Sequence, residues 1–183
     1  MRIALVDGNP DAGNTLFGER LALHGRALSE AGHTVELIRL QGKTIHWCTG
    51  CFSCWVKTPG ICVFKDDQTD ILRSFLNSDV VVFASPLFMG FYSALLKKTI
   101  DRVIPLIIPY IEFADGECRH PLRYDSMPRM AFLYEREEDT DEEDIGIVST
   151  AFERFARNGH TKFLFARPLG DDSGEVRHAI EHL

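Results

Sequence analysis

Apolar and polar positions along the chain alternate between two periods, which predicts strands and helices in turn. Apolar residues between Leu16 and Leu28 recur at helical spacing before Gly32, a residue type that often follows the end of a helix. The run Val80 to Ala84 is almost wholly apolar, as is typical of a parallel strand buried on both faces. Strands are predicted over 2–6, 33–40, 80–84, 130–134 and 162–166. Helices are predicted over 15–31, 67–77, 93–104, 142–157 and 175–183.

This alternation predicts an α/β fold with one parallel sheet, right-handed crossovers and helices on both faces. Five strands suggest a flavodoxin-like three-layer sandwich with strand order 2-1-3-4-5. We expect one domain over residues 1–183, with a cysteine-rich insertion at about 41–67. Ligands of such sheets bind beyond the carboxyl ends of the strands, at the switch point between strands one and three. The loops that leave those strand ends are therefore the candidate site.

Composition narrows the class of protein. The formal net charge of −7 disfavours a nucleic-acid-binding protein, which needs a basic face for phosphates. The longest apolar stretches, 80–83 and 103–111, are too short to span a membrane, and no signal peptide is recognisable at Met1. Five cysteines, four of them clustered, suit a reducing compartment better than a disulfide scaffold, so we expect a cytoplasmic protein.

Four cysteines, Cys48, Cys51, Cys54 and Cys62, are the strongest chemical feature of the chain. Their spacing is close to that of bacterial iron–sulfur ligands, which favours a cubane cluster. Zinc is the weaker alternative, because structural zinc usually takes two separated cysteine pairs. Unliganded thiols are the third alternative. The residue Gly50 and the pair Pro59-Gly60 provide turns that would fold this segment tightly.

The loop after the first strand, Gly8 to Thr15, resembles a phosphate-binding turn that opens a helix. Asn14 stands where a P-loop has its lysine, so one phosphomonoester suits the loop better than a nucleoside triphosphate. Asn14 and Thr15 would add side-chain donors to the backbone amides. The simpler alternative is an ordinary strand-to-helix turn with Thr15 near the N-cap.

The segment after the third strand, Ser85 to Ser93, is rich in aromatic and sulfur-containing side chains beside a glycine. We expect a loop here that forms a flat apolar surface with free backbone amides, which a tricyclic ring requires. The alternative is that Phe88 and Phe91 only pack the loop.

Together these two loops, with Leu96-Lys97 and Ile100-Asp101-Arg102, resemble the NAD(P)H-dependent FMN reductase family of flavodoxin-like proteins. The cysteine run resembles the iron–sulfur flavoprotein branch of that family. The resemblance is strong from residue 2 to about 101. It implies an FMN bound by the first and third loops, a [4Fe–4S] cluster bound by the four cysteines, and electron transfer between them. NAD(P)H or a redox partner protein would exchange electrons with the protein, and contacts in a homo-oligomer, a dimer or tetramer, would bring cluster and flavin close. The implied flavin-binding residues are Asn9, Gly13, Asn14, Thr15, Pro86, Leu87, Phe88, Met89 and Gly90.

Two segments depart from the family pattern. Asp11 stands where relatives carry a phosphate-facing arginine, which removes a charged hydrogen bond of roughly 1.5–3 kcal/mol. Residues 135–144 are strongly acidic, where relatives carry small residues. This acidic run suits a solvated loop before a helix N-terminus, or alternatively a negative rim that repels phosphate-bearing cofactors.

Three other functions remain possible from the sequence: a cluster-free NAD(P)H-dependent FMN or quinone reductase, an electron carrier without turnover, and a zinc-stapled binding module. No Ser/His/Asp arrangement favours a hydrolase. Trp47 and Trp55 flank the cysteines and could shield a cluster from water. Cys118 has no spaced partner and is interpreted as a bystander, and a structural role is favoured for His120.

Overall fold

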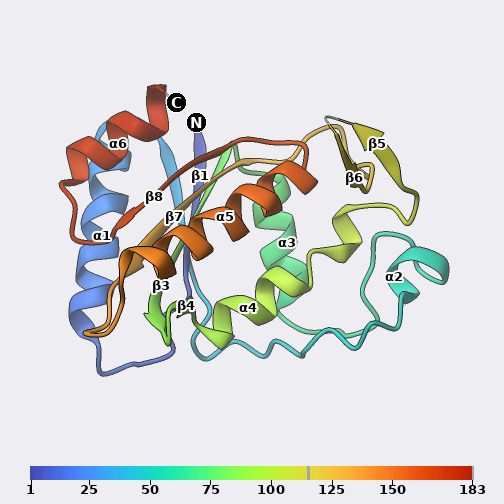
Figure 1. The fold of residues 1–183 in the computed structure, drawn as a ribbon, viewed down its shortest axis with the longest axis horizontal. Helices are drawn as coiled ribbons and strands as arrows, with labels where there is room; N and C mark the ends of the chain where they lie inside the picture. The colour runs from blue at the N-terminus through green and yellow to red at the C-terminus, as the bar shows by residue number, and fades with distance from the viewer. Residues whose placement is uncertain (115, 183) are drawn as a thin grey trace.

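The computed structural model describes residues 1–114 and 116–182 as an α/β sandwich (Figure 1). Its strands are β1 (Arg2–Asp7), β2 (Thr34–Arg39), β3 (Val80–Phe88), β4 (Phe91–Tyr92), β5 (Glu112–Ala114), β6 (Glu117–Arg119), β7 (Arg129–Glu135) and β8 (Phe163–Pro168). Its helices are α1 (Thr15–Glu30), α2 (Ser53–Val56), α3 (Gln68–Leu76), α4 (Ala94–Asp101), the 3₁₀ turn η1 (Ile104–Leu106), α5 (Glu142–Asn158) and α6 (Ser173–His182).

The central sheet has the strand order β2-β1-β3-β7-β8, and all four pairings along this path are parallel. This order confirms the predicted flavodoxin-like arrangement of five strands. The short strand β4 adds an antiparallel partner to the end of β3. Helices α1 and α6 cover one face of the sheet, and α3, α4 and α5 cover the other (Figure 1).

Two hydrophobic cores form because neighbouring side chains of a strand point to opposite faces of the sheet. In β3, Val81 and Phe83 join the core beneath α3, α4 and α5. Val80 and Val82 join the core beneath α1 and α6. All four side chains are fully buried, so β3 is hydrophobic on both faces, as the sequence predicts for a central parallel strand.

The third strand is longer than its apolar core. β3 continues to Phe88 and turns back through Met89 and Gly90 into β4. Both turn residues have left-handed φ values, +51° and +74°, as a two-residue type I′ hairpin requires. The prediction of a loop from Ser85 to Ser93 is therefore wrong. The sequence missed the hairpin because its turn uses Met89, which seldom adopts a positive φ.

Other elements differ from the prediction at their ends or were missed. Helix α4 ends at Asp101, before the predicted limit, and a separate turn containing Pro105 follows it. The last helix begins at Ser173, and its predicted end at residue 183 lies outside the described residues. The four-residue helix α2 and the three-residue strands β5 and β6 were not predicted, because such short elements carry no periodic pattern.

Acidic residues of the run 135–144 cap helix α5. Asp141 accepts a hydrogen bond from the amide of Asp144, and the Asp144 side chain accepts one from the amide of Asp141. This capping box places carboxylates where the helix dipole favours them. Among the described residues, no helix has both the length and the apolar character needed to cross a bilayer.

We predict that Gly90→Ala destabilises the protein in two ways. The left-handed backbone would cost about 1–2 kcal/mol for a residue with a Cβ. A Cβ at this position would also lie 2.1 Å from Oδ1 of Asp144 and displace a side chain of the capping box, which adds a loss of about 0.5–2 kcal/mol. Urea unfolding at neutral pH measures the sum.

The matched control is the same substitution in an Asp144→Ala background, where only the backbone penalty should remain. Equal losses of stability in the two backgrounds would show that Gly90 and Asp144 do not interact.

Candidate functional site

The loop after β1 is held by hydrogen bonds within itself. The side chain of Asn9 donates to the carbonyl of Asp11 at 3.0 Å and accepts from the amide of Asp11 at 3.0 Å. The amide of Asn9 donates to Asp7, and burial raises the pKa of the Asp7 carboxyl despite that bond. Asn9 thus shapes the loop from inside, and its side chain is only 7% exposed.

The Asp11 carboxylate accepts a hydrogen bond from a backbone amide of this loop. Its Oδ1 accepts a hydrogen bond from the amide of Gly13 at 2.8 Å. A Cβ at Gly13 would lie 3.1 Å from the same oxygen, so the carboxylate sits directly against the glycine. The loop therefore holds an anion of its own where a phosphate is predicted to bind, and it carries that group on an exposed side chain.

Asn14 is the N-cap of α1 rather than a free donor. Its side-chain oxygen accepts from the amide of Phe17 at 3.1 Å, and its side-chain amide donates to Glu135 at 2.7 Å. Glu135 also pairs with Arg20 at 3.3 Å. The sequence did not indicate that Glu135, at the end of β7, would reach the start of α1.

Thr15, the first residue of α1, is exposed and faces solvent at the carboxyl edge of the sheet. Its amide donates to the carbonyl of Gly13 at 2.9 Å. Within the described part of the chain its hydroxyl has no hydrogen-bond partner, so this donor is available to a ligand.

The residues predicted on the third loop divide between the core and the surface. Pro86 is buried, and Leu87 is fully buried among the residues beneath α3, α4 and α5. Phe88 is 41% exposed, and Met89 is 92% exposed at the tip of the hairpin. Gly90 is buried against Asp144. Of the flavin-binding residues predicted on this third segment, Phe88 and Met89 are the two that expose their side chains.

The four cysteines of the segment between β2 and α3 line one cavity of about 190 Å³. Left-handed backbone at Gly50, Phe52 and Gly60 turns the segment back on itself. Cys54 is buried in the short helix α2, Cys62 is half-buried, and Cys48 and Cys51 lie at the exposed rim. The rest of the wall is mainly apolar, with Phe52, Val63, Phe64, Ile104 and Pro105.

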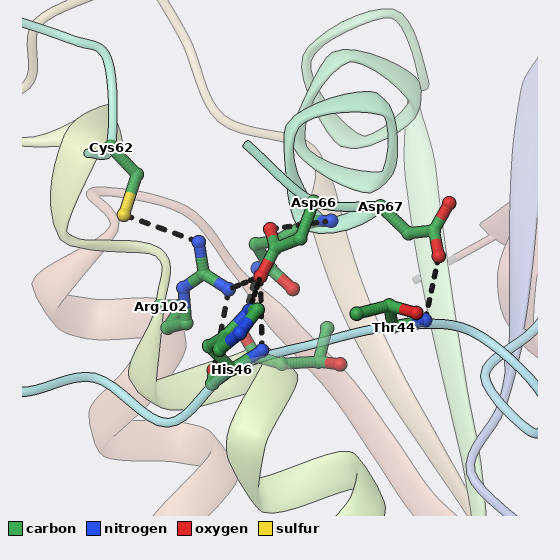
Figure 2. Close-up of polar contacts among 8 residues, drawn as sticks. Thr44, His46, Cys62, Asp66, Asp67 and Arg102 are labelled. Carbon is green, nitrogen blue, oxygen red and sulfur yellow. Dashed lines mark hydrogen bonds and ion pairs between the residues drawn. The ribbon is translucent and has the colours of Figure 1, made fainter. Parts of the chain in front are cut away.

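Hydrogen bonds close the base of this segment. The amide of Thr44 donates to Asp67 at 2.7 Å, and the amide of Asp67 donates to the carbonyl of Thr44 at 3.1 Å. The amide and Nδ1 of His46 both bond Asp66, at 2.9 and 3.0 Å. The segment is therefore anchored where it leaves β2 and again where it enters α3 (Figure 2).

Arg102, which follows α4, extends from the core to the cysteines. Its guanidinium forms an ion pair with Asp66 and donates to the carbonyl of His46 at 3.2 Å. The other terminal nitrogen donates to Sγ of Cys62 at 3.1 Å (Figure 2). The side chains of Arg102 and Asp66 are each only 1% exposed. The sequence placed Arg102 in a family motif but did not indicate this contact.

The surroundings of Asp66 and Arg102 favour the charged form of each side chain. Burial would raise the pKa of Asp66, but hydrogen bonds from Arg102 and His46 lower it to about 2. Burial would likewise lower the pKa of Arg102, and its hydrogen bonds to Asp66 and Cys62 instead raise it. The guanidinium beside Cys62 is therefore a permanent positive charge.

Two of the thiols differ in their environments. Burial raises the pKa of the Cys54 thiol, and the neighbouring thiols of Cys62 and Cys51 raise it further. Hydrogen bonds from the amide and hydroxyl of Ser53 lower the pKa of the Cys51 thiol.

Within the described ranges, no group of three or more His, Cys, Asp or Glu side chains is arranged to hold a metal ion. The four thiols surround a cavity instead of meeting at one point.

Trp55 ties the cysteine segment to the residues after α4. Its indole nitrogen donates to the carbonyls of Ile104 and Ile107, at 3.2 and 3.1 Å, and its ring contacts Phe52 and His120. Trp55 is thus an anchor of the segment, while Trp47 is 55% exposed beneath Lys98. Cys118 lies exposed on β6, outside the cavity.

Helix α4 joins the two candidate sites. Before its first turn, Ser93 donates to the carbonyl of Gly8 at 2.6 Å, which fixes the loop after β1. After its last turn, Arg102 bonds Cys62. Eight helical residues span about 12 Å, so the loop and the cavity lie at opposite ends of one short helix.

Comparison with known proteins gives a family match over most of the chain. Residues 1–115 match the family described as NADPH-dependent FMN reductase. An iron-sulfur flavoprotein of Methanocaldococcus jannaschii is 36% identical over 111 residues, which cover 60% of this chain and 55% of that protein. An iron-sulfur flavoprotein of Archaeoglobus fulgidus is 38% identical over 80 residues, 44% of this chain and 36% of that protein. The chain thus spans about half the length of these relatives, or less.

Solved structures share the fold at low sequence identity. A protein of Klebsiella pneumoniae described as a quinone reductase superposes with a TM-score of 0.68 at 16% identity, over 98% of this chain and 82% of that one. An FMN-dependent NADH-azoreductase of Bacillus anthracis, solved in complex with FMN, gives a TM-score of 0.59 at 15% identity, over 97% and 92% of the two chains. These likenesses establish the flavodoxin-like fold.

We predict that Asp66→Asn destabilises the protein at pH 7 by about 3–5 kcal/mol, because it leaves the buried Arg102 guanidinium without its counter-ion. The pKa of Asp66 is lowered on folding, so its stabilisation is complete above about pH 4 and is lost as the pH falls towards 2. Urea unfolding of both proteins at pH 7, 5 and 3.5 measures the difference.

Asp70→Asn is the matched control, because Asp70 pairs with Arg73 on the surface and both side chains are more than 70% exposed. Its effect should stay below about 1 kcal/mol. An Asp66→Asn loss as small as this, or one that does not change with pH, would contradict the assignment.

Proposed function

The chain belongs to the NADPH-dependent FMN reductase family, and on this premise we propose that it is an FMN-dependent oxidoreductase with a [4Fe–4S] cluster on Cys48, Cys51, Cys54 and Cys62. One observation carries the cluster: these four thiols, spaced as iron–sulfur ligands, line a single cavity. The alternative that the thiols are unliganded offers no reason for that convergence. The names of the relatives agree with the proposal.

The residues around the cavity suit an inorganic cluster. The donor set consists of thiols, which are the ligands of iron–sulfur clusters. The remaining wall is mainly apolar. A terminal nitrogen of Arg102 donates to Sγ of Cys62 at 3.1 Å, so the wall also holds a cationic hydrogen-bond donor beside one of the proposed ligands.

The loop after β1 suits one phosphate. It follows a strand and opens α1, with the exposed hydroxyl of Thr15 free. Asp11 already binds the amide of Gly13, which supports an anion preference of that donor. A phosphate would have to displace this carboxylate, so we expect weaker FMN binding than in relatives with an arginine here.

Flavin would supply conversion between two-electron donors such as NADPH and the one-electron chemistry of a cluster. The protein positions the two groups. Ser93 holds the first loop at one end of α4, and Arg102 holds Cys62 at the other. Phe88 and Met89 provide an exposed apolar surface beside the first loop, suited to an isoalloxazine ring.

We propose that the protein works as a homo-oligomer. Tyr110, Ile111 and Phe113, around β5, are each at least 70% exposed. They adjoin the cysteine segment, since Trp55 contacts His120 just after β6. Exposed apolar side chains gathered in one region are typical of protein contacts. We propose that a second chain binds at this surface, next to the cysteine segment.

Anaerobic reconstitution tests the proposed function. We predict about four iron and four sulfide per chain, and FMN, not FAD, released by heat and identified by mass. Cys51→Ala should lose the iron and keep the FMN, because the flavin loops leave other strand ends. Cys118→Ala is the matched control and should keep both, because Cys118 lies outside the cavity.

One zinc per chain, or no iron uptake by the wild-type protein, would contradict the cluster. Recovery of FAD would contradict the flavin assignment. Equal iron loss in Cys51→Ala and Cys118→Ala would show that the cavity is not the site.

Thr15→Val tests the phosphate position. The substitution keeps the shape of the side chain and removes its hydroxyl donor, so the Kd for FMN should rise by roughly ten- to a hundredfold. Fluorescence quenching of added FMN measures it. Thr34→Val is the control: Thr34 begins β2, at the amino ends of the parallel strands, so this substitution should leave the Kd for FMN unchanged. An unchanged Kd in Thr15→Val would place the phosphate elsewhere.

A further inference from the structure

Arg102 presents a fixed, buried cation to the cysteine cavity. Its side chain is 1% exposed and lines the cavity that the four cysteines form. One terminal nitrogen lies 3.1 Å from Sγ of Cys62 (Figure 2). The guanidinium thus directs one donor to a cysteine sulfur of the cavity.

The surrounding residues hold this guanidinium in place. Asp66, itself 1% exposed, pairs with the terminal nitrogen that faces away from Cys62. The carbonyl of His46 accepts from that same nitrogen at 3.2 Å. Phe64 lies 5.4 Å from the guanidinium, ring centroid to Cζ, and stacks on the ring of His46. A side chain fixed on several sides keeps its direction when a ligand enters the cavity.

We propose that Arg102 is the positioning residue that stabilises the cluster and raises its reduction potential, through its hydrogen bond to the sulfur of Cys62 and its positive charge. This inference rests on the proposed function. Hydrogen bonds to the ligand sulfurs and local charge are among the factors that set the potential of iron–sulfur clusters. Outer partners of metal ligands also contribute to affinity for the metal.

The sign of the effect follows from charge. A cluster that accepts one electron becomes more negative, and a nearby cation stabilises that form more than the oxidised form. Removing the guanidinium should therefore lower the midpoint potential. Asp66 offsets part of the charge, but it lies on the far side of the guanidinium from Cys62, so the directed bond to sulfur remains.

The experiment compares FMN-loaded, anaerobically reconstituted proteins by electron paramagnetic resonance during a redox titration. The variants are Arg102→Lys, Arg102→Met and the double variant Arg102→Met with Asp66→Asn. In Arg102→Met alone, the buried Asp66 carboxylate would lose its counter-ion, which could unfold the protein, and the double variant avoids this. Arg123→Met is the matched control, because Arg123 also lies beside the segment but, among the described residues, donates to backbone carbonyls, including that of Cys54, and to no cysteine sulfur.

We expect a lower midpoint potential in the double variant, a smaller decrease in Arg102→Lys and little change in Arg123→Met. Iron should also be lost to a chelator at roughly 10–100-fold lower concentration in the double variant. If the wild-type protein binds no iron, the proposed function fails and this inference with it. If the wild-type protein binds the cluster but the double variant keeps its potential, or Arg123→Met shifts it equally, only the role of Arg102 is overturned.

Discussion

The buried ion pair between Asp66 and Arg102 is the interaction on which the cysteine segment depends. It joins the chain before α3 to the end of α4, and through His46 it also holds the chain that leaves β2. Removing two charges from water costs about as much as their attraction returns, so such a pair is a weak source of stability. The pair does fix the positions of both side chains, because each partner excludes alternative arrangements of the other. The consequence is a guanidinium held against Cys62.

The remaining walls of the cysteine cavity are shaped by the turns and contacts of the segment between its fixed ends. Left-handed residues turn the segment between its two fixed ends, and Trp55 secures α2 to the chain after α4. The sequence predicted the cysteines as one set from spacing alone, since the four lie within fifteen residues. It could not predict Asp66 or Arg102 as their neighbours, because that contact joins residues 36 positions apart and leaves no local pattern.

The difference between local patterns and long-range contacts also explains what could be predicted of the rest of the fold and of the first loop. Apolar β3 and amphipathic α1 were predicted because burial imposes a period on consecutive residues. The hairpin at Met89 was missed because its turn breaks the usual residue preference, and Glu135 was missed because its contact with Asn14 is long-range. Asp11 was recognised as a departure from the family, but its bond to Gly13 depends on the folded loop. Local chemistry was visible in the sequence, and pairing between distant segments was not.

Native mass spectrometry of the anaerobically reconstituted protein tests the central claim most directly, because it weighs everything that one chain holds. We predict a mass per chain equal to the polypeptide plus one four-iron, four-sulfide cluster and one FMN. A chain that carries one zinc ion, or FMN with no inorganic mass, would contradict the claim that the cysteine cavity is an iron–sulfur site.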